Sequence, residues 1–121
     1  MLNNENFKEV LKESRFAVTL ISGEGCANCV SMLPMVLKLK EREDMDVFIV
    51  EVGPSNYEIN EHYDIKVVPT ILLTSFGEAV SKITGYQPEE IFELYIDAKL
   101  DEINKKGNEN KSFRDDLKNG L

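Results

Sequence analysis

The chain has 121 residues, which is enough for one domain with a buried core and too few for two domains of ordinary size. Its composition, 42% hydrophobic and 30% charged, is that of an ordinary globular protein. The net charge of −8 argues against binding to nucleic acid or to anionic membranes, because both would repel the chain.

The first half of the chain alternates helical and strand patterns. Residues 5–14 carry apolar side chains at helical spacing and predict a short helix. Residues 16–21 are nearly uncharged and rich in β-branched side chains, which predicts a strand buried on both faces, and residues 46–52 predict a second buried strand. Between them, residues 26–42 show helical periodicity, and Pro34 should bend that helix.

The second half of the chain predicts a hairpin and a final helix. Residues 56–63 are polar with interspersed apolar side chains and predict a short helix. Residues 70–74 and 79–84 predict strands joined by a tight turn. Pro88, followed by two glutamates, is a typical helix start, and the apolar pattern of that helix ends near Ile103.

The order of these elements predicts an α/β fold. The first two strands, joined by a right-handed crossover helix, should be parallel, and the last two should form an antiparallel hairpin. We expect a mixed four-stranded sheet flanked by helices. A shift to polar residues predicts one domain over residues 1–104, including the N-terminal helix, and a polar, mobile tail over residues 105–121.

The two cysteines of the chain form the motif Cys26-Ala27-Asn28-Cys29, between the first strand and the following helix. An isolated pair with this spacing in a reducing compartment is typical of a catalytic, redox or metal site. Only a thiolate attacks a disulfide sulfur, and a helix start stabilises negative charge. We therefore predict a dithiol exchange site with Cys26 as nucleophile and Cys29 as resolving thiol. Two reduced cysteines that merely pack are the alternative.

A metal site is less consistent with this sequence. Zinc normally takes four ligands from Cys, His or carboxylate side chains. The two cysteines and the sole histidine, His62, cannot complete such a site within one subunit, although two C-x-x-C pairs could share one across a dimer. We predict no metal and no bound cofactor, and we interpret His62 as a surface residue.

Taken together, these motifs make the chain resemble the thioredoxin-like superfamily. The resemblance covers residues 16–103 and depends on the C-x-x-C motif after the first strand, on Pro34, and on residues 63–70. It implies a thioredoxin-like fold and a cis peptide bond between Val68 and Pro69. The Val68 backbone would then face the cysteines and pair with an extended substrate segment. A trans proline that ends a loop is the alternative.

The chain departs from the family around the motif. Gly25 stands where thioredoxins carry tryptophan, the dipeptide Ala27-Asn28 replaces Gly-Pro, and Leu20 replaces a buried aspartate that is thought to take the proton from the resolving thiol. We expect Gly25, Ala27 and Asn28 to form part of the substrate-binding surface. Without the aspartate, release of the mixed disulfide should be slow.

Two glutamates are candidate proton acceptors in place of the missing aspartate. Glu51 lies on the neighbouring strand, but a shift of one residue would reverse the direction of its side chain. Glu24 lies next to the motif and opposes thiolate formation, so the pKa of Cys26 should be only modestly below that of free cysteine. Glu24 can equally be a solvated loop residue, and the sequence favours Glu51 as a charge at the end of a strand over a proton acceptor.

These observations predict a thiol–disulfide oxidoreductase that acts on protein disulfides on the reducing side. A reductase or a small-molecule thiol would supply its electrons, and we expect a monomer. A non-enzymatic binding module and a redox sensor of narrow specificity are the alternatives. Residues 1–7 lack the features of a signal peptide, and no apolar run reaches the roughly 20 residues of a membrane span, so a cytoplasmic location is expected if the chain is complete.

Overall fold

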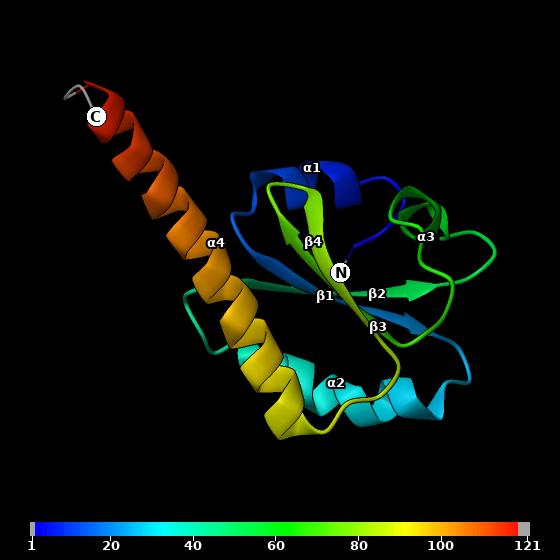
Figure 1. Ribbon diagram of the computed structural model, residues 1–121. Helices are drawn as coiled ribbons and strands as arrows, with labels where there is room; N and C mark the ends of the chain where they lie inside the picture. The colour runs from blue at the N-terminus through cyan, green and yellow to red at the C-terminus, as the bar shows by residue number, and fades with distance from the viewer. Residues whose placement is uncertain (1, 119–121) are drawn as a thin grey trace. The chain divides into compact units, whose positions relative to one another are not determined.

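The computed structural model describes the backbone of residues 2–118 and the side chains of residues 2–105. The chain divides into two compact units, one up to Gln87 and one from Pro88 onward. The first contains α1 (Phe7–Glu13), β1 (Ala17–Gly23), α2 (Ala27–Leu39), β2 (Asp46–Val52), α3 (Glu58–His62), β3 (Thr70–Ser75) and β4 (Glu78–Thr84), and the second contains α4 (Glu89–Lys118) (Figure 1). None of the helices within the described residues is long and apolar enough to cross a membrane.

Within the described residues, four strands form one sheet in the order β2-β1-β3-β4. β1 and β2 are parallel, with Ala17 opposite Asp46, and β3 is antiparallel to both β1 and β4. Phe76 and Gly77 join β3 to β4 with φ angles of 50° and 85°. Two positive φ angles in a two-residue loop fit the twist of a hairpin. The predicted mixed α/β sheet, with a parallel pair and an antiparallel hairpin, is confirmed.

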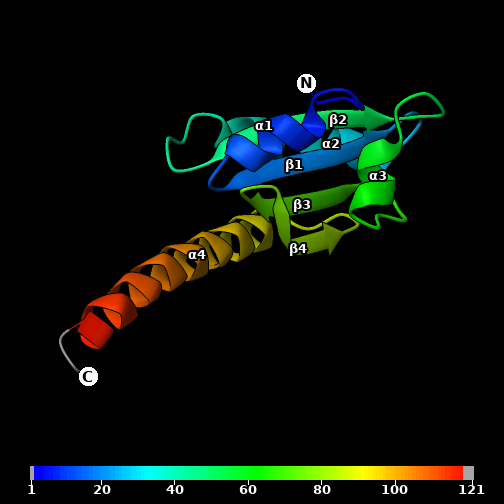
Figure 2. The ribbon, with the colours of Figure 1, turned by 90° about the horizontal axis from the view of Figure 1, so that it is seen from above.

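Helices cover both faces of the sheet. α1 and α3 lie over one face and α2 lies over the other (Figures 1 and 2). Phe7, Ile21 and Ile59 belong to the hydrophobic core under α1 and α3. Because side chains alternate along a strand, Leu20 and Ser22 of β1 face the opposite side, toward α2. At the end of β1, just before the cysteine motif, Ile21 therefore faces α1 and α3, whereas Leu20 and Ser22 face α2.

Residues 46–52 form the predicted strand, β2, but it is less buried than expected, because Asp46 and Glu51 are exposed and the strand lies at an edge of the sheet. Val50 is its one fully buried residue. The N-terminal segment covers part of the open edge, since the backbone N–H of Leu2 donates to the carbonyl of Ile49 at 3.1 Å. Phe48 and Val52 pack partly against the core. The apolar composition of β2 therefore reflects the helices above and below it.

In the second unit, α4 continues beyond the end predicted near Ile103 and reaches Lys118. Lys105 forms an ion pair with Asp101, one turn earlier, at 3.2 Å. Charged residues such as Lys, Glu and Arg are good helix formers, so a polar composition alone does not end a helix. The predicted mobile tail over residues 105–121 concerns side chains that lie largely outside the described residues. Its mobility and the boundary at residue 104 stay predictions.

Candidate active site

The cysteine motif lies at the start of α2. A disulfide joins Cys26 to Cys29, with 5.2 Å between their Cα atoms. Cys26 caps the helix, because the backbone N–H of Cys29 donates to its Sγ atom at 3.2 Å. Cys26 is half-buried, whereas Cys29 is only 2% exposed. Exchange requires access to a sulfur atom, so Cys26 is the member of the pair that a partner can reach.

The loop between β1 and α2 exposes the residues that flank Cys26. Gly25 has a φ angle of 72°, in the left-handed region that glycine adopts without strain. Glu24, Gly25, Ala27 and Asn28 are all exposed. Residues 22–34 contain no Lys, Arg or His. The favourable electrostatic contribution to an anionic Cys26 sulfur in this segment therefore comes from the N-terminus of α2 and its free N–H groups.

A second loop, between α3 and β3, contains the peptide bond between Val68 and Pro69, which is cis. Two hydrogen bonds hold this loop: Thr70 Oγ1 donates to the carbonyl of Val67 at 2.7 Å, and the N–H of Gly85 donates to the carbonyl of Pro69 at 2.8 Å. Within the described residues, the backbone N–H and C=O of Val68 have no hydrogen-bond partner. Hydrogen bonds thus hold the loop on both sides of Val68, whose own backbone groups remain available for pairing.

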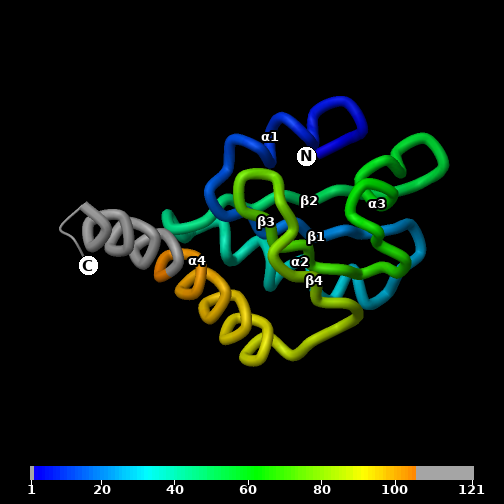
Figure 3. Tube along the Cα trace, turned by 45° about the horizontal axis from the view of Figure 1, so that its top comes forward, coloured from blue at the N-terminus to red at the C-terminus, as the bar shows by residue number. Residues whose placement is uncertain are grey.

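These two loops lie at the same end of the sheet (Figure 3). Ile21 of β1 is opposite Thr70 of β3, so the chain after β1 and the chain before β3 leave the sheet next to each other. The Val68 side chain lies against Gly23, the last residue of β1: a Cβ atom on Gly23 would be 3.1 Å from Val68 Cγ2. Val68 therefore lies against the end of β1, three residues before Cys26. The sequence reasoning missed Gly23, for which the signal was a glycine ending a buried strand just before the motif.

The two candidate proton acceptors are exposed. Glu51 is in register with Ser22 and so belongs to the same sheet face as α2, which resolves the direction of its side chain. Glu24 lies in the loop before Cys26, and its side chain is also exposed. Leu20, at the place of the missing aspartate, is completely buried. No hydrogen bond joins either glutamate to Cys29 in the described residues, so their role stays a prediction.

Charged and aromatic side chains lie between α3 and the second loop. Burial raises the pKa of Tyr63, whose hydroxyl donates to the carbonyl of Gly77 at 2.7 Å. A hydrogen bond from Lys66 lowers the pKa of Asp64. His62 is exposed and packs edge-on against the Tyr63 ring, with 4.6 Å between ring centres. In the part of the chain that the structure describes, no three His, Cys, Asp or Glu side chains form a metal-binding group.

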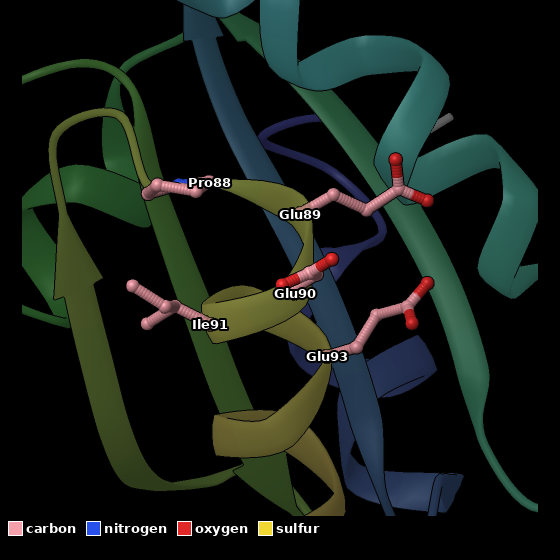
Figure 4. Close-up of a pocket in the computed structure, with 5 residues that line it drawn as sticks. All are labelled: Pro88, Glu89, Glu90, Ile91 and Glu93. Atoms are coloured by element: carbon pink, nitrogen blue, oxygen red, sulfur yellow. The ribbon is translucent and has the colours of Figure 1, made fainter.

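A separate hollow lies at the start of α4, within the second unit. Its lining consists of Pro88, Glu89, Glu90, Ile91 and Glu93 (Figure 4). Glu89 and Glu93 extend to one side, away from Pro88 and Ile91. The lining is acidic and contains no cysteine.

Comparison with known proteins identifies the family. The sequence model of the Thioredoxin family matches residues 1–98. The chain belongs to the thioredoxin family. Among curated thioredoxins, it is 26% identical over 94 residues to Thioredoxin-2 of Pyricularia oryzae, which is 75% of this chain and 53% of that protein. It is 24% identical over 95 residues to chloroplastic Thioredoxin F of Oryza sativa subsp. japonica, with 76% and 51% coverage. The chain thus spans about half the length of these curated relatives.

Solved thioredoxin structures share the fold. The crystal structure of Chlamydomonas reinhardtii thioredoxin f2 has a TM-score of 0.69 and 27% identity, and the match covers 77% of this chain and 89% of that one. Thioredoxin f2 in a complex with ferredoxin:thioredoxin reductase has a TM-score of 0.73 and 19% identity, over 81% and 91% of the two chains. The expected thioredoxin-like architecture is confirmed, and its C-x-x-C pair is close enough to form a disulfide.

Proposed function

We propose that this thioredoxin-family chain is a thiol–disulfide oxidoreductase that exchanges disulfides with protein substrates. The observation that carries the proposal is the pairing of a reachable Cys26 with a buried Cys29 at the start of α2. A substrate can reach the Cys26 sulfur. The buried Cys29 sulfur is close enough to Cys26 to attack the mixed disulfide and release the substrate. The match to the thioredoxin family over residues 1–98 supports the same activity.

In the reducing direction, the Cys26 thiolate attacks one sulfur of a substrate disulfide. The substrate S–S bond breaks, a mixed disulfide to Cys26 forms, and the departing substrate thiolate takes up a proton. Cys29 then loses its proton and attacks the Cys26 sulfur, which releases the second substrate thiol and forms the Cys26–Cys29 disulfide. Two electrons pass from the protein to the substrate. The Cys29 N–H, 3.2 Å from the Cys26 sulfur, and the helix N-terminus stabilise the charge on that sulfur.

The Val68 loop is the proposed docking element for the substrate chain. Its neighbours Val67 and Pro69 already use their carbonyl groups in hydrogen bonds, whereas both backbone groups of Val68 are unpaired in the described residues. An extended substrate segment can pair with that N–H and C=O as an added strand would. The exposed Gly25, Ala27 and Asn28 would contact the substrate on the other side of the disulfide.

The surroundings of Cys26 support the reducing direction. Strong oxidants of this chemistry stabilise their reduced form, which requires a well stabilised thiolate. Here residues 22–34 supply no cationic side chain, and the exposed Glu24 adds a negative charge. Redox titration with thiol counting by mass spectrometry should give a midpoint potential near about −270 mV, and a value near about −120 mV would contradict the reducing direction.

A reductase or a small-molecule thiol is the proposed electron donor. The solved complex of thioredoxin f2 with ferredoxin:thioredoxin reductase supports a reductase as partner for a protein of this fold. We further propose that the chain acts as a monomer in the cytoplasm. Gel filtration and cell fractionation test these two points.

Proton transfer to and from Cys29 is the proposed slow step, because the fully buried Leu20 occupies the place of the family's acid. Glu51, on the α2 face of the sheet, is the proposed acceptor, with Glu24 as the second candidate. The variant Glu51→Gln should slow the release of a preformed mixed disulfide, whereas Glu24→Gln should change it less. Equal release rates in Glu51→Gln and the wild type would exclude Glu51.

Insulin reduction in the presence of dithiothreitol tests the activity itself. The wild-type protein should accelerate precipitation of the reduced insulin chains, and Cys26→Ser should not. Equal rates would contradict the oxidoreductase proposal and favour a non-enzymatic binding module, which the absence of the buried acid also favours. Turnover of one partner protein without any turnover of insulin would instead indicate a redox sensor of narrow specificity.

A further inference from the structure

Gly23, three residues before Cys26, lies close to the side chain of Val68. A Cβ atom on Gly23 would lie 3.1 Å from Val68 Cγ2, 3.8 Å from Cγ1 and 3.9 Å from its Cβ. The backbone of Gly23 does not have the left-handed φ angle found at Gly25, Gly77 and Gly85. A side chain at this position is therefore disfavoured by the space that Val68 occupies and not by backbone conformation.

Neither partner of this contact moves easily. Gly23 is held in the sheet, in register with Val52 of β2. Val68 packs partly against the hydrophobic core, and the hydrogen bonds of Val67 and Pro69 fix the loop on both sides of it. A valine side chain is also stiff about its first torsion. An added methyl group on Gly23 would thus displace the loop by a few tenths of an ångström rather than only rotate a side chain.

We propose that Gly23 is a positioning residue that sets the distance between the substrate-pairing backbone of Val68 and the Cys26 sulfur. The proposal depends on the disulfide exchange proposed above. A substrate chain bound to the Val68 backbone must bring its own disulfide into line with Cys26, three residues after Gly23. Misplacement of about 1 Å can cost a factor of about 100 in rate, so a few tenths of an ångström should cost about 3- to 10-fold.

A second expectation separates positioning from general damage. Hydroxyethyl disulfide is a small substrate with no peptide backbone, so it cannot pair with Val68. Its reduction depends on the two cysteines alone. A displaced Val68 loop should therefore impair the reduction of insulin and leave the reduction of hydroxyethyl disulfide unchanged.

The test compares Gly23→Ala, Val68→Ala and the double variant, with kcat/KM measured for insulin and for hydroxyethyl disulfide. Gly23→Ala should lose about 3- to 10-fold on insulin alone. In the Val68→Ala background, which removes both Cγ atoms, the same change at Gly23 should have no further effect. Gly53→Ala is the matched control, because a Cβ atom there would meet nothing within 4 Å and its φ angle is not left-handed.

Several results would overturn the proposal. These are an unchanged insulin activity in Gly23→Ala, an equal loss on both disulfides, or an equal loss in the Val68→Ala background. If Gly23→Ala fails to fold, recovery of folding and activity in the double variant supports the contact, and no recovery overturns it. A wild-type protein inactive on both disulfides would overturn the proposed function and this inference with it, whereas an active wild type with an unaffected Gly23→Ala overturns this inference alone.

Discussion

Reduction of the Cys26–Cys29 disulfide should lower the free energy of unfolding by about 2 kcal/mol. The bond joins residues separated by three positions and so closes a loop of four residues. The chain-entropy relation gives about 6 cal/mol/K for such a loop, or about 2 kcal/mol at 25 °C. By the thermodynamic cycle, the folded pair should then be about 40 mV more reducing than the same motif in the unfolded chain.

Urea unfolding of the oxidised and reduced protein measures this difference. The chain contains no tryptophan, so far-ultraviolet circular dichroism is the suitable signal. With a denaturant dependence of about 2 kcal/mol per molar urea, the midpoint of the reduced protein should lie about 1 M below that of the oxidised protein. A variant with both Cys26→Ser and Cys29→Ser is the control, and dithiothreitol should not move its midpoint. A reduced protein more stable than the oxidised one would contradict the reducing direction.

Three further substitutions test contacts that hold α3 and the turn between β3 and β4. Tyr63→Phe removes the 2.7 Å hydrogen bond to the Gly77 carbonyl and should cost about 1 kcal/mol at pH 7. Burial raises the pKa of Tyr63, so the folded state keeps its proton longer than the unfolded state, and the wild type should lose stability as pH rises past 10. Tyr63→Phe should lose less over the same range, and parallel curves would refute this. Asn4→Ala removes a side-chain oxygen that accepts from the N–H of Glu58, the first residue of α3, at 3.0 Å. It should cost about 1 kcal/mol in urea unfolding, and Asn4→Asp, which keeps an acceptor, should lose less. Gly77→Ala forces a side chain onto a φ angle of 85° and should cost about 1 kcal/mol or more, whereas an unchanged midpoint would show that the hairpin tolerates another turn.

Much of the fold could be predicted because local chemistry and tertiary structure agree. The apolar run of β1, the glycine at Gly77 and the Pro88 helix start each specify their element without reference to the rest of the chain. The dithiol site could also be predicted, because the spacing of the two cysteines and their place at the start of a helix determine their chemistry.

Other features depend on contacts that sequence periodicity does not encode. An apolar strand can lie in the centre or at the edge of a sheet, so composition alone does not predict how far β2 is buried. The polar composition after Ile103 favours the end of a helix, although charged residues continue α4 to Lys118. The contact of Gly23 with Val68 joins residues that are far apart in sequence, and only the pairing of β1 with β3 brings them together.

Trapping of a mixed disulfide tests the central claim most directly. The Cys29→Ser variant, incubated with a substrate protein that carries a disulfide, should form a stable covalent adduct. Mass spectrometry of the digested adduct should place the bond at Cys26, and Cys26→Ser should form none. An adduct at Cys29 in Cys26→Ser, or no adduct with either variant, would contradict the account of Cys26 as the sulfur that meets the substrate.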